Sequence, residues 1–219
     1  MTESDPLGRA LTDAARREPL GPAATGAAPP DRAALPDVSA RAASAGLLDV
    51  AYAELDSAVG RLLLAATPRG LVRVAYVDFS GEDAVLAALA EKVSPRVLAA
   101  PRRLDEPRRE LEEYLAGGRR RFELALDWRL VRGFGRRVLE ATAQVPYGSV
   151  STYKQVAREA GNERASRAAG NALGANPLPI VVPCHRILHS TGGLGGYTGG
   201  LERKRMLLQI ESGQATLGA

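Results

Sequence analysis

The 219-residue sequence predicts an α/β (α+β) domain with a small antiparallel sheet, followed by a mostly helical domain that contains a helix-turn-helix. Three observations support this prediction. Short apolar stretches separated by turn residues begin at Leu47, as in strands joined by hairpins. Helical periods follow them, and in the second half glycine and proline divide these into short pieces. We therefore expect a tail (1–46), an α/β domain (47–127), a helix-turn-helix domain (128–212) and a short C-terminal tail (213–219).

The N-terminal tail is predicted to be disordered. Ala, Pro, Gly, Arg and Asp dominate residues 1–46, and the pair Pro29-Pro30 interrupts any long element. Only Leu7 to Arg17 has a pattern suited to a short helix. A segment with so few large apolar side chains to bury does not offset the entropy lost on ordering.

Four strands are expected in the α/β domain. Tyr52 to Leu55 and Gly60 to Ala66 are apolar stretches joined by a turn. Gly70 precedes a third stretch, Leu71 to Val77. Phe122 to Leu126 alternates between apolar and polar residues, which is typical of a fourth strand.

Two helices are expected between the third and fourth of these strands. The first covers residues 82–93 and places Val85, Leu86, Leu89 and Val93 on one side. The second covers Leu104 to Leu115 and ends before a pair of glycines.

Three helices are expected at the start of the C-terminal domain. The first covers Phe134 to Val145. The second begins at the N-cap residues Ser151 and Thr152 and runs up to a turn at Gly161-Asn162. The third covers Ala165 to Ala175, so the last two form the helix-turn-helix pattern. Helical hairpins in protein cores share this pattern, and it does not by itself establish nucleic-acid binding.

The third of these helices has almost no side-chain bulk. A helix that reads bases needs long polar side chains, and this one offers only Arg167. Its backbone can therefore approach a partner closely while one long cation projects from it. The alternative is a small-residue face that packs on another helix. The small residues are Ala165, Ala168, Ala169, Gly170, Ala172 and Gly174.

Composition narrows the class of protein. A single cysteine rules out an internal disulfide, and with only His185 and His189 as histidines no zinc site of Cys and His ligands is expected. The chain shows neither an apolar run long enough to cross a membrane nor the pattern of a signal peptide. These features predict a cytoplasmic protein.

Positive charge is concentrated in the C-terminal domain. The formal net charge is −1 over residues 1–46, −2 over 47–127 and +7 over 128–219. This asymmetry indicates a polyanionic partner for the C-terminal domain, although a solvated basic surface explains the charge equally well.

The only cysteine lies in the run Pro183-Cys184-His185-Arg186. The apolar stretch Leu178 to Val182 before it is predicted to be a buried strand, and the glycine-rich stretch Ser190 to Gly200 after it a flexible loop. A thiol becomes a good nucleophile once it loses its proton, and a positioned histidine can take that proton. A lone cysteine is nevertheless more often a small buried hydrophobe.

A longer set of residues resembles a known family, the alkylguanine-DNA alkyltransferases, also called methylated-DNA–protein-cysteine methyltransferases. The resemblance covers roughly residues 50 to 212, and its Pro-Cys-His-Arg core is highly specific. The matching residues are Pro146-Tyr147-Gly148, Thr152-Tyr153, Arg167-Ala168-Ala169-Gly170, Asn176-Pro177, Pro183-Cys184-His185-Arg186, the stretch Gly196 to Leu201, Lys204 and Glu211.

The resemblance implies repair of DNA by direct reversal. In this family a cysteine thiolate attacks the alkyl carbon of a 6-O-alkylguanine, and the alkyl group passes irreversibly to sulfur in a single turnover. The base has to leave the double helix first. The resemblance also implies a winged helix-turn-helix that enters the minor groove of double-stranded DNA. No cofactor and no metal are implied. We expect a monomer, and cooperative binding to DNA is left open.

The resemblance assigns catalytic roles to several residues. Cys184 is the alkyl acceptor, and His185 takes the thiol proton through a water. Glu211 orients and charges that histidine, as the third member of a triad does. Asn176 ties the helix-turn-helix to the turn that holds the cysteine, and Lys204 lies close to the site.

The resemblance also assigns residues that hold DNA. Arg167 fills the place that the flipped base leaves in the stack. Tyr153 presses on the backbone of the flipped nucleotide and donates a hydrogen bond to the guanine ring, which improves the leaving group. Thr152, Ala168 and Gly170 are expected to contact DNA beside these two residues.

The pocket for the flipped guanine is implied in the same way. Tyr197 forms one wall, and the backbone at Thr198 contacts the alkylated oxygen. Leu194 supplies a backbone carbonyl, and Pro179 is expected to line the pocket.

Three departures from the family pattern are present. The extra Cys and His of zinc-binding members are absent, Ala169 replaces a more usual valine, and the first 46 residues are additional. The alternatives are a non-catalytic regulator or lesion-binding protein of the same fold, and a thiol hydrolase. Cys184 with Glu211 argues against the first, and the small-residue helix would have no purpose in the second.

Overall fold

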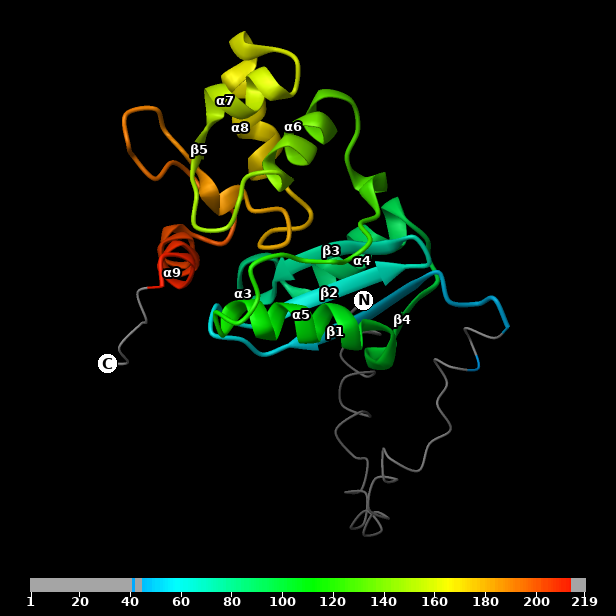
Figure 1. The fold of residues 1–219 in the computed structure, drawn as a ribbon. Coiled ribbons are helices and arrows are strands. Elements are labelled where there is room, and N and C mark those ends of the chain that lie inside the picture. Colours follow the sequence, from blue (N-terminus) through cyan, green and yellow to red (C-terminus); the bar gives the residue numbers. More distant parts are fainter. Residues whose placement is uncertain (1–40, 42–44, 214–219) are drawn as a thin grey trace, which may run out of the picture. The chain divides into compact units, whose positions relative to one another are not determined.

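A four-stranded sheet opens the part of the chain that the computed structural model describes, residue 41 and residues 45–213 (Figure 1). The strands are β1 (Val50–Leu55), β2 (Leu62–Thr67), β3 (Gly70–Tyr76) and β4 (Val97–Ala99), in the order β3-β2-β1-β4. The predicted tail and its helix at Leu7 to Arg17, apart from residues 41, 45 and 46, lie outside the described residues. The predicted C-terminal tail lies outside them beyond residue 213.

The sheet is mixed. β1, β2 and β3 are antiparallel as predicted, whereas β4 pairs in parallel with β1 through Val50 and Val97. β4 was not predicted. Three residues are too few to show the two-residue period of a strand, so only the neighbouring strand reveals it.

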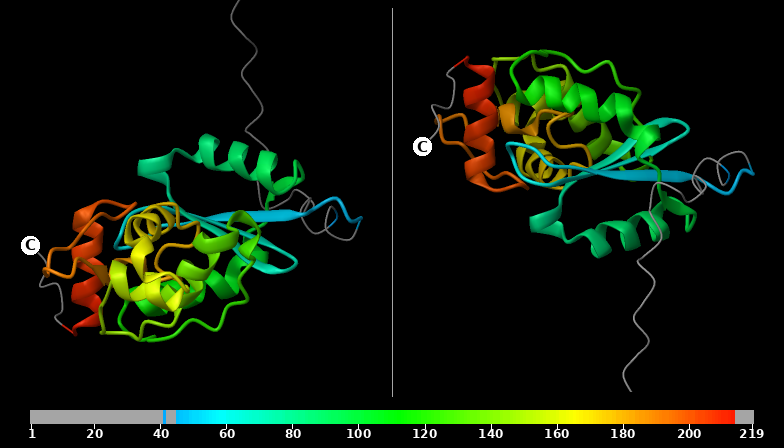
Figure 2. Two further views of the ribbon diagram at one scale, coloured as in Figure 1. Left: turned by 90° about the horizontal axis from the view of Figure 1, so that it is seen from above. Right: turned by 90° about the horizontal axis from the view of Figure 1, so that it is seen from below.

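Both faces of the sheet are covered (Figure 2). Because side chains alternate along a strand, Leu62 and Leu64 of β2 join one apolar cluster, and Leu63 and Ala65 join another. Helix α4 (Glu82–Lys92) covers the second cluster with Val85 and Leu89. The first cluster contains residues of the C-terminal half, such as Leu207, so a boundary at 127/128 stays a prediction.

Helix α5 (Asp105–Leu115) packs on the first face of the sheet, after the 3-10 turn Pro101–Leu104. It buries Leu111 and Tyr114 completely. A short helix that was not predicted, α3 (Val77–Ser80), directly follows β3.

The second half of the described chain is mainly helical, which confirms the predicted fold class. Its helices are α6 (Gly133–Ala143), α7 (Tyr153–Glu159), α8 (Ser166–Gly174) and α9 (Leu201–Glu211). Thr152 caps α7 as predicted, because its hydroxyl accepts a hydrogen bond of 3.2 Å from the backbone N–H of Gln155. A short turn joins α7 to α8, and the strands β5 (Ser151–Thr152) and β6 (Ile187–Leu188) pair in parallel.

The predicted strand Phe122 to Leu126 does not form. Leu71 exchanges two hydrogen bonds of 2.8 Å with the segment 125–127, which makes one isolated bridge. Three residues later, the N–H of Val74 donates to the carbonyl of Pro177 (2.8 Å) instead. Two segments therefore share the edge of β3, and the segment 122–126 alternates in burial without forming a ladder.

The buried strand predicted over Leu178 to Val182 is also wrong. These residues are buried, but they form turns. The N–H of Val182 donates to the carbonyl of Leu178 (2.8 Å), and Ile180 has a φ of 74°, which a strand does not contain. The apolar pattern predicted burial correctly, and the backbone closes on itself instead of pairing.

None of the helices in the described part of the chain is long and apolar enough to span a membrane.

Candidate active site

Cys184 begins a 3-10 turn, Cys184–Arg186, and only 5% of its surface is exposed. The side chain of Asn176 organises this turn. Its Nδ2 donates to Cys184 Sγ (3.2 Å) and to the carbonyl of Val182 (2.9 Å), and its Oδ1 accepts from the N–H of Leu178 (3.0 Å). Asn176, at the end of α8, thus holds both the turn and the thiol.

The buried thiol is protonated at neutral pH. Burial raises the pKa of Cys184 to about 11, although the hydrogen bond from Asn176 and the charge of Lys204 oppose the shift. A base next to the thiol is therefore required before it can act as a nucleophile.

His185 is the candidate for that base. Its ring is fully buried, and its Nε2 lies 2.8 Å from Oε1 of Glu211. Burial lowers the pKa of His185, so the ring is neutral near pH 7 and Nε2 carries the proton that it donates to the carboxylate. The other nitrogen, Nδ1, is then a free acceptor: it is buried and has no hydrogen-bond partner among the described residues.

Glu211, in the last turn of α9, is an ionised carboxylate. Burial alone would raise its pKa, but hydrogen bonds from His185 and Arg186 lower the pKa to about 2. Oε2 also accepts from the N–H of Gly148 (3.0 Å), and Oε1 accepts from the hydroxyl of Tyr114. The donors on this carboxylate come from several separate segments of the chain.

Tyr114 and Arg186 were not predicted to have a role. Arg186 donates from Nε (3.0 Å) and Nη2 (2.9 Å) to Glu211, and Tyr114 Oη also lies 3.2 Å from His185 Nε2. The sequence indicates only weakly that Tyr114 belongs to the site. It is a tyrosine on the buried side of an amphipathic helix, where a hydroxyl needs a partner.

We expect Tyr114→Phe to lower the free energy of unfolding by about 2 kcal/mol, because it removes a buried hydrogen bond to a charged acceptor and keeps the ring. Urea unfolding measures this loss. Tyr147→Phe is the matched control, because that hydroxyl donates to the uncharged carbonyl of Ile210 (3.1 Å) and should matter less. Equal losses in the two variants would contradict a special role for Tyr114.

Lys204 holds the loop that follows the cysteine through hydrogen bonds to its backbone. Its fully buried ammonium donates to the carbonyls of Ile187 (2.6 Å), Leu194 and Gly196 (3.4 Å). Burial lowers the pKa of Lys204 to about 8. The backbone carbonyl of Leu194 therefore accepts a hydrogen bond from Lys204.

A cavity of about 700 Å³ holds Cys184. Of the predicted residues, Tyr153, Arg167, Gly170, Tyr197 and Thr198 also line it. Thr152, Ala168, Leu194 and Pro179 do not: Thr152 caps α7, and Pro179 is buried in the turn before the cysteine. The catalytic candidates Asn176, His185, Lys204 and Glu211 are buried and do not line the cavity.

The sheet supports one wall of this cavity. The hydroxyl of Tyr197 lies 2.8 Å from the hydroxyl of Tyr76, at the end of β3. Arg203 places its guanidinium 4.6 Å from the centre of the Tyr76 ring and donates to the carbonyl of Gly199 (2.9 Å). Tyr76 was not predicted to belong to the site either.

Helix α8 has two different faces. Arg167 and Ala168 are exposed, whereas Ala169 and Leu173 are buried against the core. The small residues therefore fit both interpretations made from the sequence. Ala169 packs in the core, and Ala168 leaves little side-chain bulk beside Arg167 on the exposed face.

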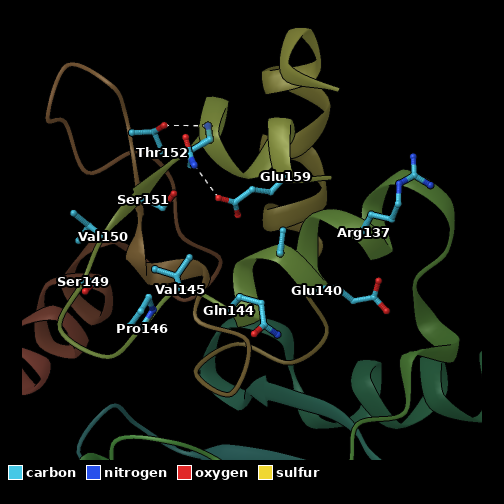
Figure 3. Close-up of a pocket in the computed structure, with 12 residues that line it drawn as sticks. Arg137, Glu140, Gln144, Val145, Pro146, Ser149, Val150, Ser151, Thr152 and Glu159 are labelled. Carbon is cyan, nitrogen blue, oxygen red and sulfur yellow. Dashed lines mark hydrogen bonds between the residues drawn. The ribbon is translucent and has the colours of Figure 1, made fainter. Parts of the chain in front are cut away.

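A larger cavity of about 1020 Å³ lies between α6, the loop 145–152 and α7 (Figure 3). It contains no histidine or cysteine, and some of its polar groups already have protein partners. Gln155 donates to Glu159 (2.8 Å), and Arg137 donates to the carbonyl of Ala160 (2.9 Å). The cavity at Cys184 is therefore the candidate active site.

Both halves of the chain are similar to known proteins. Two family models match the chain: the ribonuclease-like domain of 6-O-methylguanine DNA methyltransferase over residues 50–128, and the DNA binding domain of the same protein over residues 133–213. Methylated-DNA--protein-cysteine methyltransferase from Mycolicibacterium paratuberculosis is 37% identical over 74% of this chain and 92% of its own length. The protein of that name from Methanosarcina acetivorans is 36% identical over 73% and 97%.

Solved structures show the same likeness. The crystal structure of the O6-methylguanine methyltransferase of Mycobacterium tuberculosis is 33% identical, with a TM-score of 0.64 over 77% of this chain and 96% of that one. The structure of Mycobacterium tuberculosis OGT in complex with DNA is 32% identical, with a TM-score of 0.65 over 76% and 96%.

Proposed function

This chain belongs to the methylated-DNA–protein-cysteine methyltransferase family and repairs DNA by direct reversal, and we propose that Cys184 accepts one alkyl group per molecule from 6-O-alkylguanine. The observation that supports this acceptor most directly is the buried arrangement of thiol, neutral imidazole and ionised carboxylate. A non-catalytic regulator of the same fold would have no use for His185 and Glu211 behind the thiol. Incubation with an oligonucleotide that carries one 6-O-methylguanine, followed by intact mass measurement, tests the proposal.

The reaction starts with a proton transfer. Cys184 loses its proton through a water to Nδ1 of His185, which has no protein partner among the described residues. The imidazolium that forms is stabilised by the carboxylate of Glu211, 2.8 Å from Nε2. Glu211 keeps its own charge because its pKa is about 2.

Alkyl transfer follows in the cavity. The thiolate sulfur bonds to the alkyl carbon, the bond from that carbon to O6 of guanine breaks, and its electron pair moves onto the guanine ring. Burial raises the pKa of Tyr153, so its phenol stays protonated and can donate a hydrogen bond to the departing base. The proton taken from the thiol is finally returned to guanine, so the exchange is balanced.

The product limits each molecule to one transfer. The thioether that forms on Cys184 is a very stable bond, and no step of the proposed mechanism regenerates the thiol. Repair is therefore stoichiometric.

Duplex DNA is bound at the exposed face of α8. Arg167 and Ala168 lie on that face, Arg167 also lines the cavity, and the C-terminal domain carries the positive excess of the chain. Because the small side chains on this face add little bulk, the helix can approach the minor groove closely. Arg167 then enters the base stack, and the alkylated base turns into the cavity.

Arg167→Ala is expected to slow repair in duplex DNA and to spare reaction with a free 6-O-alkylguanine base. The side chain of Arg167 can replace a flipped base only in duplex DNA, because a free base has no neighbouring stacked bases. The loss of one positive charge that attracts phosphates should also lower the slope of log binding constant against log salt concentration by about one unit. Single-turnover rates with the two substrates measure the difference.

The matched control is Arg205→Ala, which removes an exposed arginine from α9, outside α7 and α8. It should leave both rates unchanged. If Arg167→Ala slows the free-base reaction as much as duplex repair, Arg167 supports the fold or the cavity and does not act on the DNA stack.

A further inference from the structure

Phe79 is an exposed aromatic side chain on the wall of the cavity that holds Cys184. It lies on α3, the short helix that follows β3, and 64% of its surface is exposed. The other large apolar side chains that the structure describes as exposed range from 43% to 56%, and none of them lines this cavity. No role assigned above uses Phe79.

The backbone under Phe79 is held from several sides. Val77 is buried, and its N–H donates to the carbonyl of Arg61 (2.9 Å). Asp78 forms an ion pair with Arg203, which also donates to the carbonyl of Val59. The helix α3 is therefore anchored, and the phenyl ring is presented at the cavity without a packing role that explains it.

The cavity has more room than a methylated purine needs. Cavities of roughly 300–1,000 Å³ hold drug-sized ligands, and this one measures about 700 Å³. Leu173 and Gly174 of α8 also line the cavity. A Cβ atom built on Gly174 would meet no other atom within 4 Å, so this part of the wall is open.

The charges beside Phe79 disfavour the phosphates of DNA as its partner. Asp78 precedes it, and Glu82 and Asp83 follow at the start of α4. Phosphates avoid such an acidic neighbourhood, whereas a neutral apolar group does not. The occupant that fits is uncharged and aromatic or bulky.

We propose that Phe79 contacts the group carried on O6 of guanine and makes the protein selective for aromatic substituents, a specificity that rests on the proposed function. The ring offers the edge and face contacts that aromatic groups prefer. In the reaction Cys184 Sγ bonds to the benzylic carbon, the bond from that carbon to O6 breaks with its electron pair moving to guanine, and the thiol proton ends on guanine.

The test compares 6-O-methylguanine with 6-O-benzylguanine, each as free base and in duplex DNA. Phe79→Ala should slow benzyl transfer about tenfold in both settings, the size expected when an apolar contact is lost from a binding pocket, and leave methyl transfer nearly unchanged. Phe79→Leu should recover part of the rate. Leu47→Ala is the control, because Leu47 is an apolar residue that is 55% exposed and lies outside this cavity.

Other outcomes would overturn the assignment. If Phe79→Ala slows methyl and benzyl transfer equally, and only in duplex DNA, Phe79 is a DNA contact. If Phe79→Ala leaves benzyl transfer unchanged, Phe79 does not contact the substituent. Wild-type protein that transfers methyl but not benzyl groups would also refute it. A wild-type protein that transfers no alkyl group refutes the proposed function itself, so the two failures are distinguishable.

Discussion

Incubation with an oligonucleotide carrying one 6-O-methylguanine is expected to replace one hydrogen on Cys184 by one methyl group, with at most one transfer per molecule. The thiol is the only one in the chain, and the neutral imidazole of His185 lies next to it in sequence to take its proton. Intact mass and peptide mapping locate the methyl group. Product titration against protein concentration measures the stoichiometry.

Cys184→Ala is expected to abolish transfer completely and to leave DNA binding largely intact. Its side chain is buried, so the binding proposed for the exposed face of α8 should not depend on it. A gel-shift titration with the same oligonucleotide measures binding. Several turnovers per molecule, or a methyl group on another residue, would contradict the assignment of Cys184 as the acceptor.

Glu211→Gln is expected to impair transfer from duplex DNA and from the free base alike, because in the proposed mechanism Glu211 acts on the thiol through His185. It should also lower the free energy of unfolding by about 3–5 kcal/mol, since it leaves the buried guanidinium of Arg186 without its counter-charge. Urea unfolding and single-turnover rates measure the two effects. The control is Glu202→Gln, which neutralises a carboxylate on the same helix whose side chain is 87% exposed.

The pH dependence of stability gives a second readout. The pKa of Glu211 is about 2 in the folded protein against an ordinary value of 4.5, so its contribution is complete above about pH 4.5 and is lost as the pH falls toward 2. Glu211→Gln should lack this part of the acid dependence. If the variant keeps the wild-type acid profile and transfer rate, Glu211 does not hold His185 in the way proposed.

The sequence by itself determined the parts that depend on near neighbours. The helices α4 to α8 follow from apolar periods and from the glycine, proline and capping residues that bound them, and the cap at Thr152 follows from one residue type at one position. The motif around Cys184 places the thiol next to its histidine, with no need for the fold. Burial of Leu178 to Val182 was also predictable, because an apolar stretch avoids water whatever backbone it adopts.

Only the tertiary structure decided which distant residues complete the site. Tyr114 meets Glu211 across 97 positions of sequence, and Tyr76 meets Tyr197 across 121. The edge of β3 is shared by two segments, which removes the predicted strand at 122–126. Such contacts depend on how helices and sheet pack, and a short window of sequence records local propensity and burial but not the partner that each buried polar group finds.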